Sequence, residues 1–434
     1  MFDIRQIILL YIIMLSTTKF TILVAALALI IFYFILNINQ IHCGSYSPIQ
    51  TEIKYVDKYV EKLPWIKNFG GLGSDSTKYC FPSNDTYKNE KVKKVDLTCV
   101  VTFEYISSGY ELKQMEIAKK LDSITDFSLR RKSFVEFLTS EVELEDSYNW
   151  INLVDKKMDA TSSDSSSQKD SKHMEHMYLS RFEYKKSCGE KRVEQWTSYI
   201  EPLSIHGRHP YAIYSCLATI DEKIGFNTTD MVSKYPHYFN LKKGLGSVDH
   251  ILLDIRREYK NYYLLDAGTS YFKSSLWWFV CAYLKKSIKF DKIYGWEYSL
   301  LEPRLFWDDV PSQLKSIYSF FNAPVSSGTR DDNSPLRFIL DNADTDDFVA
   351  FKLDIDNSDI EIPIAVSILR NKSVHQLIDE FFFELHFRCE LLMLCGWGDQ
   401  MPDELSGIKL SSRYAVMNFF KELRVLGIRS HTWP

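Results

Sequence analysis

Hydrophobic positions are regularly spaced only in the C-terminal half of the chain. From about residue 178 onward, short apolar runs alternate with segments of helical periodicity, and successive runs begin roughly 25 to 30 residues apart. This spacing predicts βα units and a parallel sheet. The expected strands are residues 262–266, 292–297, 317–322, 348–354 and 380–387.

The helices expected between these strands carry their own signals. Residues 274–286 are apolar on nearly every face, which suits a helix packed on a sheet. Ser358 and Glu361 have capping-box spacing, so a helix is expected with Ser358 as its N-cap. A last helix, capped by Gly427, precedes a closing strand at 428–433. The sequence therefore predicts an α/β fold with a Rossmann-like, doubly wound, mostly parallel sheet and a closing C-terminal strand.

The N-terminus has a different pattern. Residues 20–36 carry no charged side chain, and a helix of this length, about 25 Å, nearly crosses the apolar core of a bilayer. We expect a transmembrane signal anchor at 20–41 after a short cytosolic tail at 1–19. A cleaved signal peptide is the alternative, but the apolar region exceeds the usual length of about 7 to 15 residues.

Sequons and cysteines give this anchor an orientation. Sequons at Asn84, Asn227 and Asn371 and all eight cysteines follow the span. They predict that the rest of the chain lies in the lumen of the endoplasmic reticulum or Golgi, anchored to the membrane by one helix. No disulfide pairing and no oligomeric state follow from the sequence.

A stretch of mixed pattern lies between the anchor and the regular region. A strand is expected at 97–105, and Phe134 and Leu138 share one face of a helix. Residues 160–172 are rich in Ser, Asp and Lys and lack side chains that could pack against a core. The expected division is a partly ordered stem at 42–177, a linker within it at 155–177, and a folded domain at 178–434.

Composition narrows the range of functions. Lys and Arg total 52 against 57 Asp and Glu, which gives a formal net charge of -5. No basic run is dense enough to follow a phosphate backbone, so a nucleic-acid partner is not expected. With 45% apolar residues, the chain has ample material for a hydrophobic core.

Polar residues stand where the expected strands end. In a doubly wound sheet, ligands bind beyond these carboxyl ends, near the point where the strand order reverses. Glu297 follows the second strand, where a carboxylate can accept hydrogen bonds from both hydroxyls of a ribose. Gly268 lets the turn after the first strand approach a ligand closely. The expected cofactor-binding residues are Asp266, Gly268, Ser270, Glu297 and Asp354.

The motifs at these strand ends resemble the class I, S-adenosylmethionine-dependent methyltransferases, and among them the FkbM-type branch. Asp266 and Gly268 match its first motif, D-x-G-x-N-x-G. Its K-x-D-x-E-G-x-E motif is met wholly or in charge by Lys352, Asp354, Asp356 and Asp359. Its later E-x-H-like sequence is met by Glu384 and His386. The chain also resembles uncharacterised, membrane-anchored families of algae and other protists. The resemblance implies S-adenosylmethionine as cofactor and O-methylation of a glycan or a small molecule.

Methyl transfer to an oxygen needs a base that removes the hydroxyl proton. The candidates for this role are His386, Asp354 and His209. The spacing of His173 and His176 could hold a metal, but both flank the Ser-rich linker, and no metal site is predicted.

Three positions depart from the FkbM pattern: Phe272 and Asn357 replace glycines, and Ser270 replaces an asparagine. We expect the Phe272 ring to turn toward the core, because the following residues place large rings against the sheet. Two other functions stay open. Asp354 and Asp356 imitate the D-x-D motif of a type II membrane glycosyltransferase, and a catalytically inactive domain could keep the fold as an interaction module.

Overall fold

The computed structural model describes residues 99–159, 168–188, 192–205, 259–273, 276–388 and 401–433. Within these ranges, no helix has the length and apolar character needed to cross a membrane. The expected signal anchor at 20–41 lies outside the described residues, as do the sequons at Asn84 and Asn227 and the candidate base His209.

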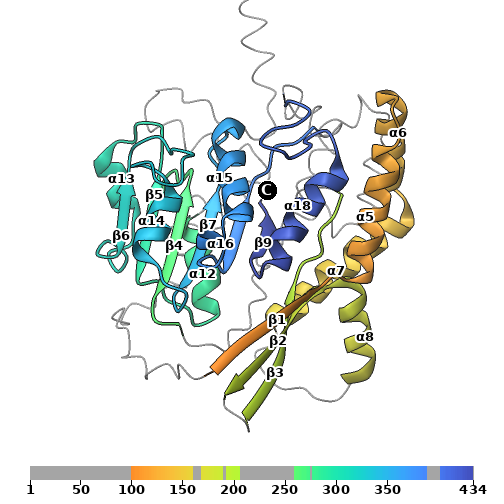
Figure 1. Ribbon diagram of the computed structural model, residues 1–434, viewed down its shortest axis with the longest axis horizontal. Helices are drawn as coiled ribbons and strands as arrows, with labels where there is room; N and C mark the ends of the chain where they lie inside the picture. Colours follow the sequence, from red (N-terminus) through yellow and green to blue (C-terminus); the bar gives the residue numbers. More distant parts are fainter. Residues whose placement is uncertain are drawn as a thin grey trace, which may run out of the picture. The chain divides into compact units, whose positions relative to one another are not determined.

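A six-stranded sheet forms the centre of the described fold (Figure 1). The strands are β4 (Tyr262–Ala267), β5 (Lys292–Trp296), β6 (Tyr318–Phe321), β7 (Phe348–Leu353), β8 (Glu380–Phe383) and β9 (Arg429–Thr432). Their order is β6-β5-β4-β7-β8-β9, and every neighbouring pair is parallel. The predicted α/β fold is confirmed, and the closing strand β9 extends the parallel sheet. The order reverses between β4 and β7, which marks the switch point where such sheets bind ligands.

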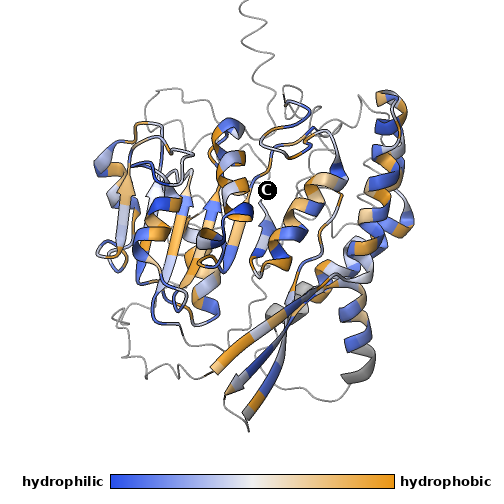
Figure 2. Ribbon diagram, in the orientation of Figure 1, coloured by the Kyte–Doolittle hydropathy of each residue, from blue (hydrophilic) through white to orange (hydrophobic). Residues whose placement is uncertain are grey.

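Helices cover both faces of this sheet (Figure 1). On one face, α12 (Leu276–Lys285) and α13 (Pro303–Asp309) pack with strand residues such as Leu264. On the other face, α14 (Pro335–Asn342), α15 (Ser358–Arg370) and α18 (Arg413–Val425) pack with strand residues such as Leu265. Successive residues of a strand point to opposite faces, so one strand supplies both cores. Figure 2 shows hydrophobic residues along this sheet, and an alternation of hydrophobic and hydrophilic residues on the outlying helices.

Local sequence signals place the helix ends to within about one residue. The prediction that Ser358 is the N-cap of α15 is wrong: the N-cap is Asn357, whose side chain makes no capping hydrogen bond. Glu361 instead accepts a hydrogen bond from the Ile355 N–H at 2.7 Å, ahead of the helix. The expected cap of α18 is confirmed, because Gly427 follows the helix at φ +99° and its N–H donates to the Arg424 carbonyl.

The segment expected to form a stem contributes a second layer to the fold. It contains α5 (Gly109–Asp122), α6 (Phe127–Leu138), α7 (Glu141–Asp159) and α8 (Gln168–Tyr178). Buried residues of these helices, including Phe134, belong to one hydrophobic cluster with residues of the sheet such as Phe351. β1 (Cys99–Ile106) pairs antiparallel with β2 (Ser180–Cys188), which pairs antiparallel with β3 (Arg192–Ile200). The structure therefore has no domain boundary at residue 178, because β1 and β2 lie on either side of it.

Two capping contacts and a disulfide strengthen this second layer. Cys99 and Cys188 face each other in the β1–β2 ladder and form a disulfide. Asp122, at the end of α5, accepts hydrogen bonds at the N-terminus of α18 from the Arg413 N–H at 3.1 Å and the Tyr414 N–H at 3.0 Å. A carboxylate at a helix N-terminus satisfies free N–H groups and complements the helix dipole. The last residue of one helix thus orients another helix far along the chain.

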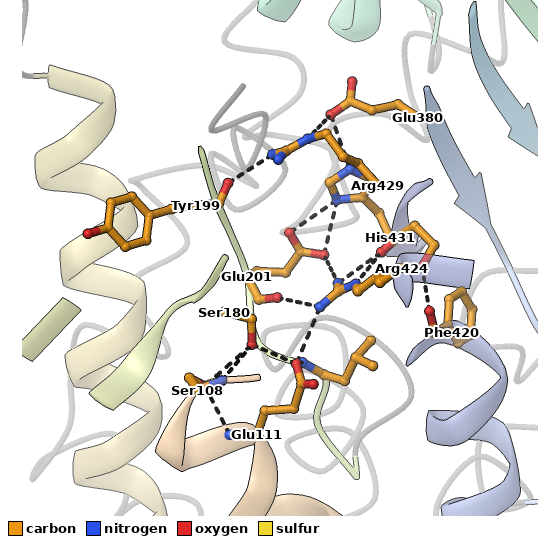
Figure 3. A network of polar contacts seen from close by, with 12 residues as sticks. Ser108, Glu111, Ser180, Tyr199, Glu201, Glu380, Phe420, Arg424, Arg429 and His431 are labelled. Carbon is orange, nitrogen blue, oxygen red and sulfur yellow. Dashed lines mark hydrogen bonds and ion pairs between the residues drawn. The ribbon is translucent and has the colours of Figure 1, made fainter. Parts of the chain in front are cut away.

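Buried charges join the second layer to α18 and β9, the last helix and the last strand of the chain (Figure 3). Arg424 of α18 has no exposed side-chain surface, and its Nη2 lies 2.9 Å from the Glu201 carboxylate. Its Nη1 lies 3.4 Å from the Glu111 carboxylate, and its Nη2 donates to the Ser430 carbonyl at 2.8 Å. One guanidinium therefore connects α5, the residues after β3, and β9.

Arg429 and His431 continue this network from β9. Arg429 donates to the Glu380 carboxylate at 3.2 Å and to the Tyr199 carbonyl at 2.8 Å. The His431 ring lies 3.0 Å from the Glu201 carboxylate and 3.3 Å from that of Glu380. Burial opposes a charge on His431, but the two carboxylates outweigh it and raise the pKa of the ring above its ordinary value of 6.5. A protonated His431 is the third cation among the three carboxylates of the network.

Replacement of Arg424 should destabilise the whole fold. Arg424→Met leaves the buried carboxylates of Glu111 and Glu201 short of their main partner, and we expect the free energy of unfolding to fall by about 3 to 5 kcal/mol. Urea denaturation measures this change. The control is Arg304→Met, because Arg304 is 86% exposed beside Asp308. This substitution should lower the free energy of unfolding by less than about 1 kcal/mol. Equal effects of the two substitutions would contradict the role given to Arg424.

His431 should make the stability depend on pH. A raised pKa in the folded state means that the protonated ring stabilises the fold fully below its unfolded pKa of about 6.5. This contribution is lost as the pH rises through the raised pKa, so the free energy of unfolding should decline from about pH 6.5 upward. Urea denaturation at several pH values should show the decline in the wild type and in His375→Gln, but not in His431→Gln. A decline that persists in His431→Gln would assign it to another group.

Candidate functional site

The carboxyl ends of three neighbouring strands form one edge at the switch point. β4 lies between β5 and β7, with Ala267 opposite Trp296 on one side and Leu353 on the other. The residues that follow these strands therefore come together, as the sequence predicts for Asp266 and Glu297. They arrive there through parallel pairing, not through closeness in the sequence.

Gly268 holds two of these strand ends against each other. Its φ is +91°, and a Cβ atom at this position would lie 1.5 Å from the backbone oxygen of Asp354. Its N–H donates to the Trp296 carbonyl at 3.0 Å. The sequence predicts that this glycine admits a ligand, but the atom that approaches it most closely belongs to the chain itself. Any larger residue would push β4 and β7 apart at the edge of the site.

Lys352, which the sequence analysis matches to a motif but not to a role, is the charged centre of this edge. Its side chain is 1% exposed, and Nζ lies 3.1 Å from the Asp266 carboxylate and 3.1 Å from that of Asp354. Burial opposes its charge, but the two carboxylates outweigh the burial and hold the pKa of Lys352 above its ordinary value. The sequence signals for this role are the motif match and a lysine inside an otherwise apolar strand, which requires a buried partner.

Lys352 and Trp433 both contact the carboxylate of Asp354. The oxygen that faces Lys352, Oδ2, also accepts a hydrogen bond from the indole N–H of Trp433 at 3.0 Å. Trp433 follows β9, is 8% exposed, and places its ring 5.7 Å from the Lys352 ammonium. The sequence predicts Asp354 as a base and cofactor ligand, and these contacts hold its carboxylate in place at the edge.

Asp266 is more deeply buried than the sequence suggests. The residue has no exposed surface, and Oδ1 accepts from Lys352. Among the described residues, Oδ2 is buried without a hydrogen-bond partner. A buried carboxylate oxygen with no donor is costly, so this atom would gain from a donor that a ligand brings. Ser270 lies partly buried at the same turn.

Glu297 is a further carboxylate of this edge and keeps part of its surface exposed. It is half-buried after β5 and accepts a hydrogen bond from the Ser299 N–H at 2.6 Å. Burial raises the pKa of Glu297 above its ordinary value, and the nearby Asp266 adds to the rise. The next residues are open to solvent: Tyr298 is 80% exposed and Leu300 is 91% exposed. A half-buried carboxylate beside an exposed ring provides both polar and apolar contacts for a ligand.

A second cluster lies beyond the ends of β7 and β8. His386 Nε2 is 3.3 Å from the Glu384 carboxylate and 3.9 Å from that of Asp356. Glu384 is buried, the His386 side chain is 17% exposed, and that of Asp356 is 71% exposed. The E-x-H sequence and the second acid of the D-x-D sequence thus meet in space. His386, an expected base, is therefore flanked by two acids.

The Phe272 ring turns toward the core, as the sequence analysis expects. The residue has no exposed surface, and its ring centre lies 6.2 Å from that of Trp277 and 6.3 Å from that of Tyr318. Asn357 stands at φ -139°, a conformation open to any residue. Neither departure from the glycines of the FkbM pattern therefore requires a distorted backbone.

Replacing Phe272 with glycine tests whether this ring obstructs a ligand or supports the core. Phe272→Gly should lower the free energy of unfolding by about 3 kcal/mol or more, through the cavity and the added backbone entropy. The neighbouring Tyr271 is 38% exposed, so Tyr271→Gly should cost less. Urea denaturation compares the two variants. A Phe272→Gly protein of unchanged stability that alone binds S-adenosylmethionine would mean that the natural ring blocks the site.

Comparisons with known proteins leave the functional argument to these residues. No protein-family model matches the chain, and neither a curated protein nor a solved structure matches it. What the chain does must be inferred from the strand order and from the side chains at the switch point.

Proposed function

We propose that the α/β domain binds S-adenosylmethionine at the carboxyl ends of β4 and β5 and methylates a hydroxyl of a glycan or a small molecule. The observation that carries the proposal is the position of Glu297, half-buried just after β5 and beside the Gly268 turn. A carboxylate there suits the two hydroxyls of a ribose, since it accepts hydrogen bonds from both. The exposed Tyr298 ring next to it is available to stack on a base.

The turn after β4 favours a nucleoside without a diphosphate. The strand order of this sheet is also that of dinucleotide-binding domains, whose first turn carries three glycines that let the backbone cradle a pyrophosphate. Between β4 and α12 this chain has one glycine, Gly268, and the backbone of Asp354 already packs against it. A cofactor that has a ribose and a base but no diphosphate therefore suits the site better than a nicotinamide dinucleotide.

The buried carboxylate of Asp266 agrees with a cationic cofactor end. Its Oδ2 lacks a donor within the described part of the chain, and the ammonium group of S-adenosylmethionine could provide one where neighbouring side chains move to uncover this buried atom. Lys352 donates to Oδ1 of the same carboxylate and shares its single positive charge with Asp354. When bound, S-adenosylmethionine supplies the methyl group and leaves as the neutral thioether. The acceptor side of such a site would lie toward Asp356, Glu384 and His386.

The glycosyltransferase alternative is less well supported at its own motif. A D-x-D site needs both aspartates free to approach a cation, whereas Asp354 shares one oxygen with the Lys352 ammonium and the Trp433 indole. A fixed positive charge at 3.1 Å opposes a second cation on that carboxylate. The remaining alternative, an inactive interaction domain, leaves the arrangement of Glu297 without a role.

The proposed setting is the lumen of the secretory pathway, with the domain anchored by the helix at 20–41. The disulfide between Cys99 and Cys188 supports an oxidising compartment, because such bonds persist there and are rare in the cytosol. The sequons that follow the span support the same orientation.

Glu297→Gln tests the proposed cofactor site. The amide loses the charge that strengthens hydrogen bonds from ribose hydroxyls, so the affinity for S-adenosylmethionine should fall by about 10- to 100-fold. Isothermal titration calorimetry of the purified chain measures this change. Glu136→Gln, at a carboxylate that is 64% exposed on α6, is the matched control and should bind as the wild type does.

The same titration, with different ligands, distinguishes the three candidate functions. Wild-type protein that binds a nucleotide sugar with manganese, and not S-adenosylmethionine, would be a glycosyltransferase and would contradict the proposal. Protein that binds neither ligand would fit the interaction domain. Equal affinities of Glu297→Gln and wild type would remove Glu297 from the site, even where the cofactor binds.

A further inference from the structure

We infer that Asp356, Glu384 and His386 form a binding site for one divalent first-row metal cation such as Mn²⁺. The three side chains come from the ends of two neighbouring parallel strands, β7 and β8. Each offers one ligand atom, and the three ligand atoms all lie within 4.8 Å of one another. Asp356 and His386 are 30 residues apart in the sequence, so only the parallel pairing of β7 and β8 brings them together.

The distances between the ligand atoms suit a shared ion. Nitrogen and oxygen ligands bind such ions at about 2.0 to 2.2 Å, so two ligands of one ion are separated by roughly 3 to 4 Å. His386 Nε2 is 3.3 Å from the Glu384 oxygen and 3.9 Å from the Asp356 oxygen. Small rotations of side chains are enough to place all three atoms around one centre.

The donor set distinguishes this cluster from an ordinary acidic patch. Two carboxylates and an imidazole are a common ligand combination for Mn²⁺, Fe²⁺ and Zn²⁺, whereas Mg²⁺ and Ca²⁺ prefer oxygen alone. Glu384 is 3% exposed and lies within ligand distance of a second acid, so a divalent cation between them would offset the repulsion of the two carboxylates. Glu384 and His386 stand two positions apart just after β8, and their side chains meet at 3.3 Å.

The surroundings leave the site open on one side. Asp356 is 71% exposed, so three protein ligands would leave coordination positions for water or for an oxygen-bearing acceptor. The metal would lie apart from Asp354, whose Oδ2 faces the Lys352 ammonium. The cation affinity does not depend on the proposed cofactor. One further step rests on the proposed function: that this cluster is the acceptor side of the site. There the ion would select substrates with hydroxyl or carboxylate oxygens.

Titration of the full chain with Mn²⁺ tests the site. The six-line electron paramagnetic resonance signal of free Mn²⁺ should decrease until about one equivalent is bound, with no S-adenosylmethionine present. Asp356→Asn should weaken the binding by at least about 10-fold, and His386→Gln should do the same. Asp308→Asn is the matched control, because Asp308 is similarly exposed at 68% and lies on α13. Its Mn²⁺ affinity should equal that of the wild type.

Several outcomes would overturn this inference. They are no Mn²⁺ binding by the wild type, an unchanged affinity in Asp356→Asn, and an equal loss in Asp308→Asn. The exposed position of Asp356 makes its variant informative even where Glu384→Gln fails to fold. Because Mn²⁺ is titrated without cofactor and S-adenosylmethionine without metal, failure of the cation site and failure of the proposed cofactor site give different results.

Discussion

The fold depends on how the buried charges of Arg424 and Arg429 find their partners. A guanidinium with no exposed surface is tolerated only where acceptors surround it, and here they come from segments that are far apart in the sequence. Arg424 needs Glu201 and Glu111, and Arg429 needs Glu380. The second layer must therefore dock at one place beside β9 and in one orientation. Hydrophobic packing alone would allow sliding, whereas the charges specify a register.

The same constraint operates on a smaller scale at the site. Lys352 is buried in β7 and has to face Asp266 and Asp354, which fixes the ends of β4 and β7 relative to each other. Gly268 permits the close approach that this arrangement requires. Lys352 thereby engages one oxygen of each of these two carboxylates. Two further carboxylates, Glu297 after β5 and Asp356 after β7, lie along the same edge of the sheet.

This division gives the site two parts with different chemistry. The part at β4 and β5 has a carboxylate and exposed apolar groups, which suits a nucleoside. The part at β7 and β8 has two acids and an imidazole, which suits a cation. Between the two parts, the buried Lys352 contacts Asp266 at the end of β4 and Asp354 just after β7.

The sequence by itself determined the local features. Alternating apolar runs predicted the strands of the six-stranded sheet, a glycine marked the end of α18, and neighbouring aromatic residues indicated that Phe272 belongs to the core. These features depend on residues close together in the chain, so periodicity and turn chemistry are sufficient to find them. Tertiary structure alone decided the full order of the strands and that α5, α6 and α7 share the core of the sheet. It also decided that Lys352 pairs with Asp354 and that Asp356 meets His386. Partner choice across such separations is set by the packing and the buried charges of the whole fold, and no local pattern records it.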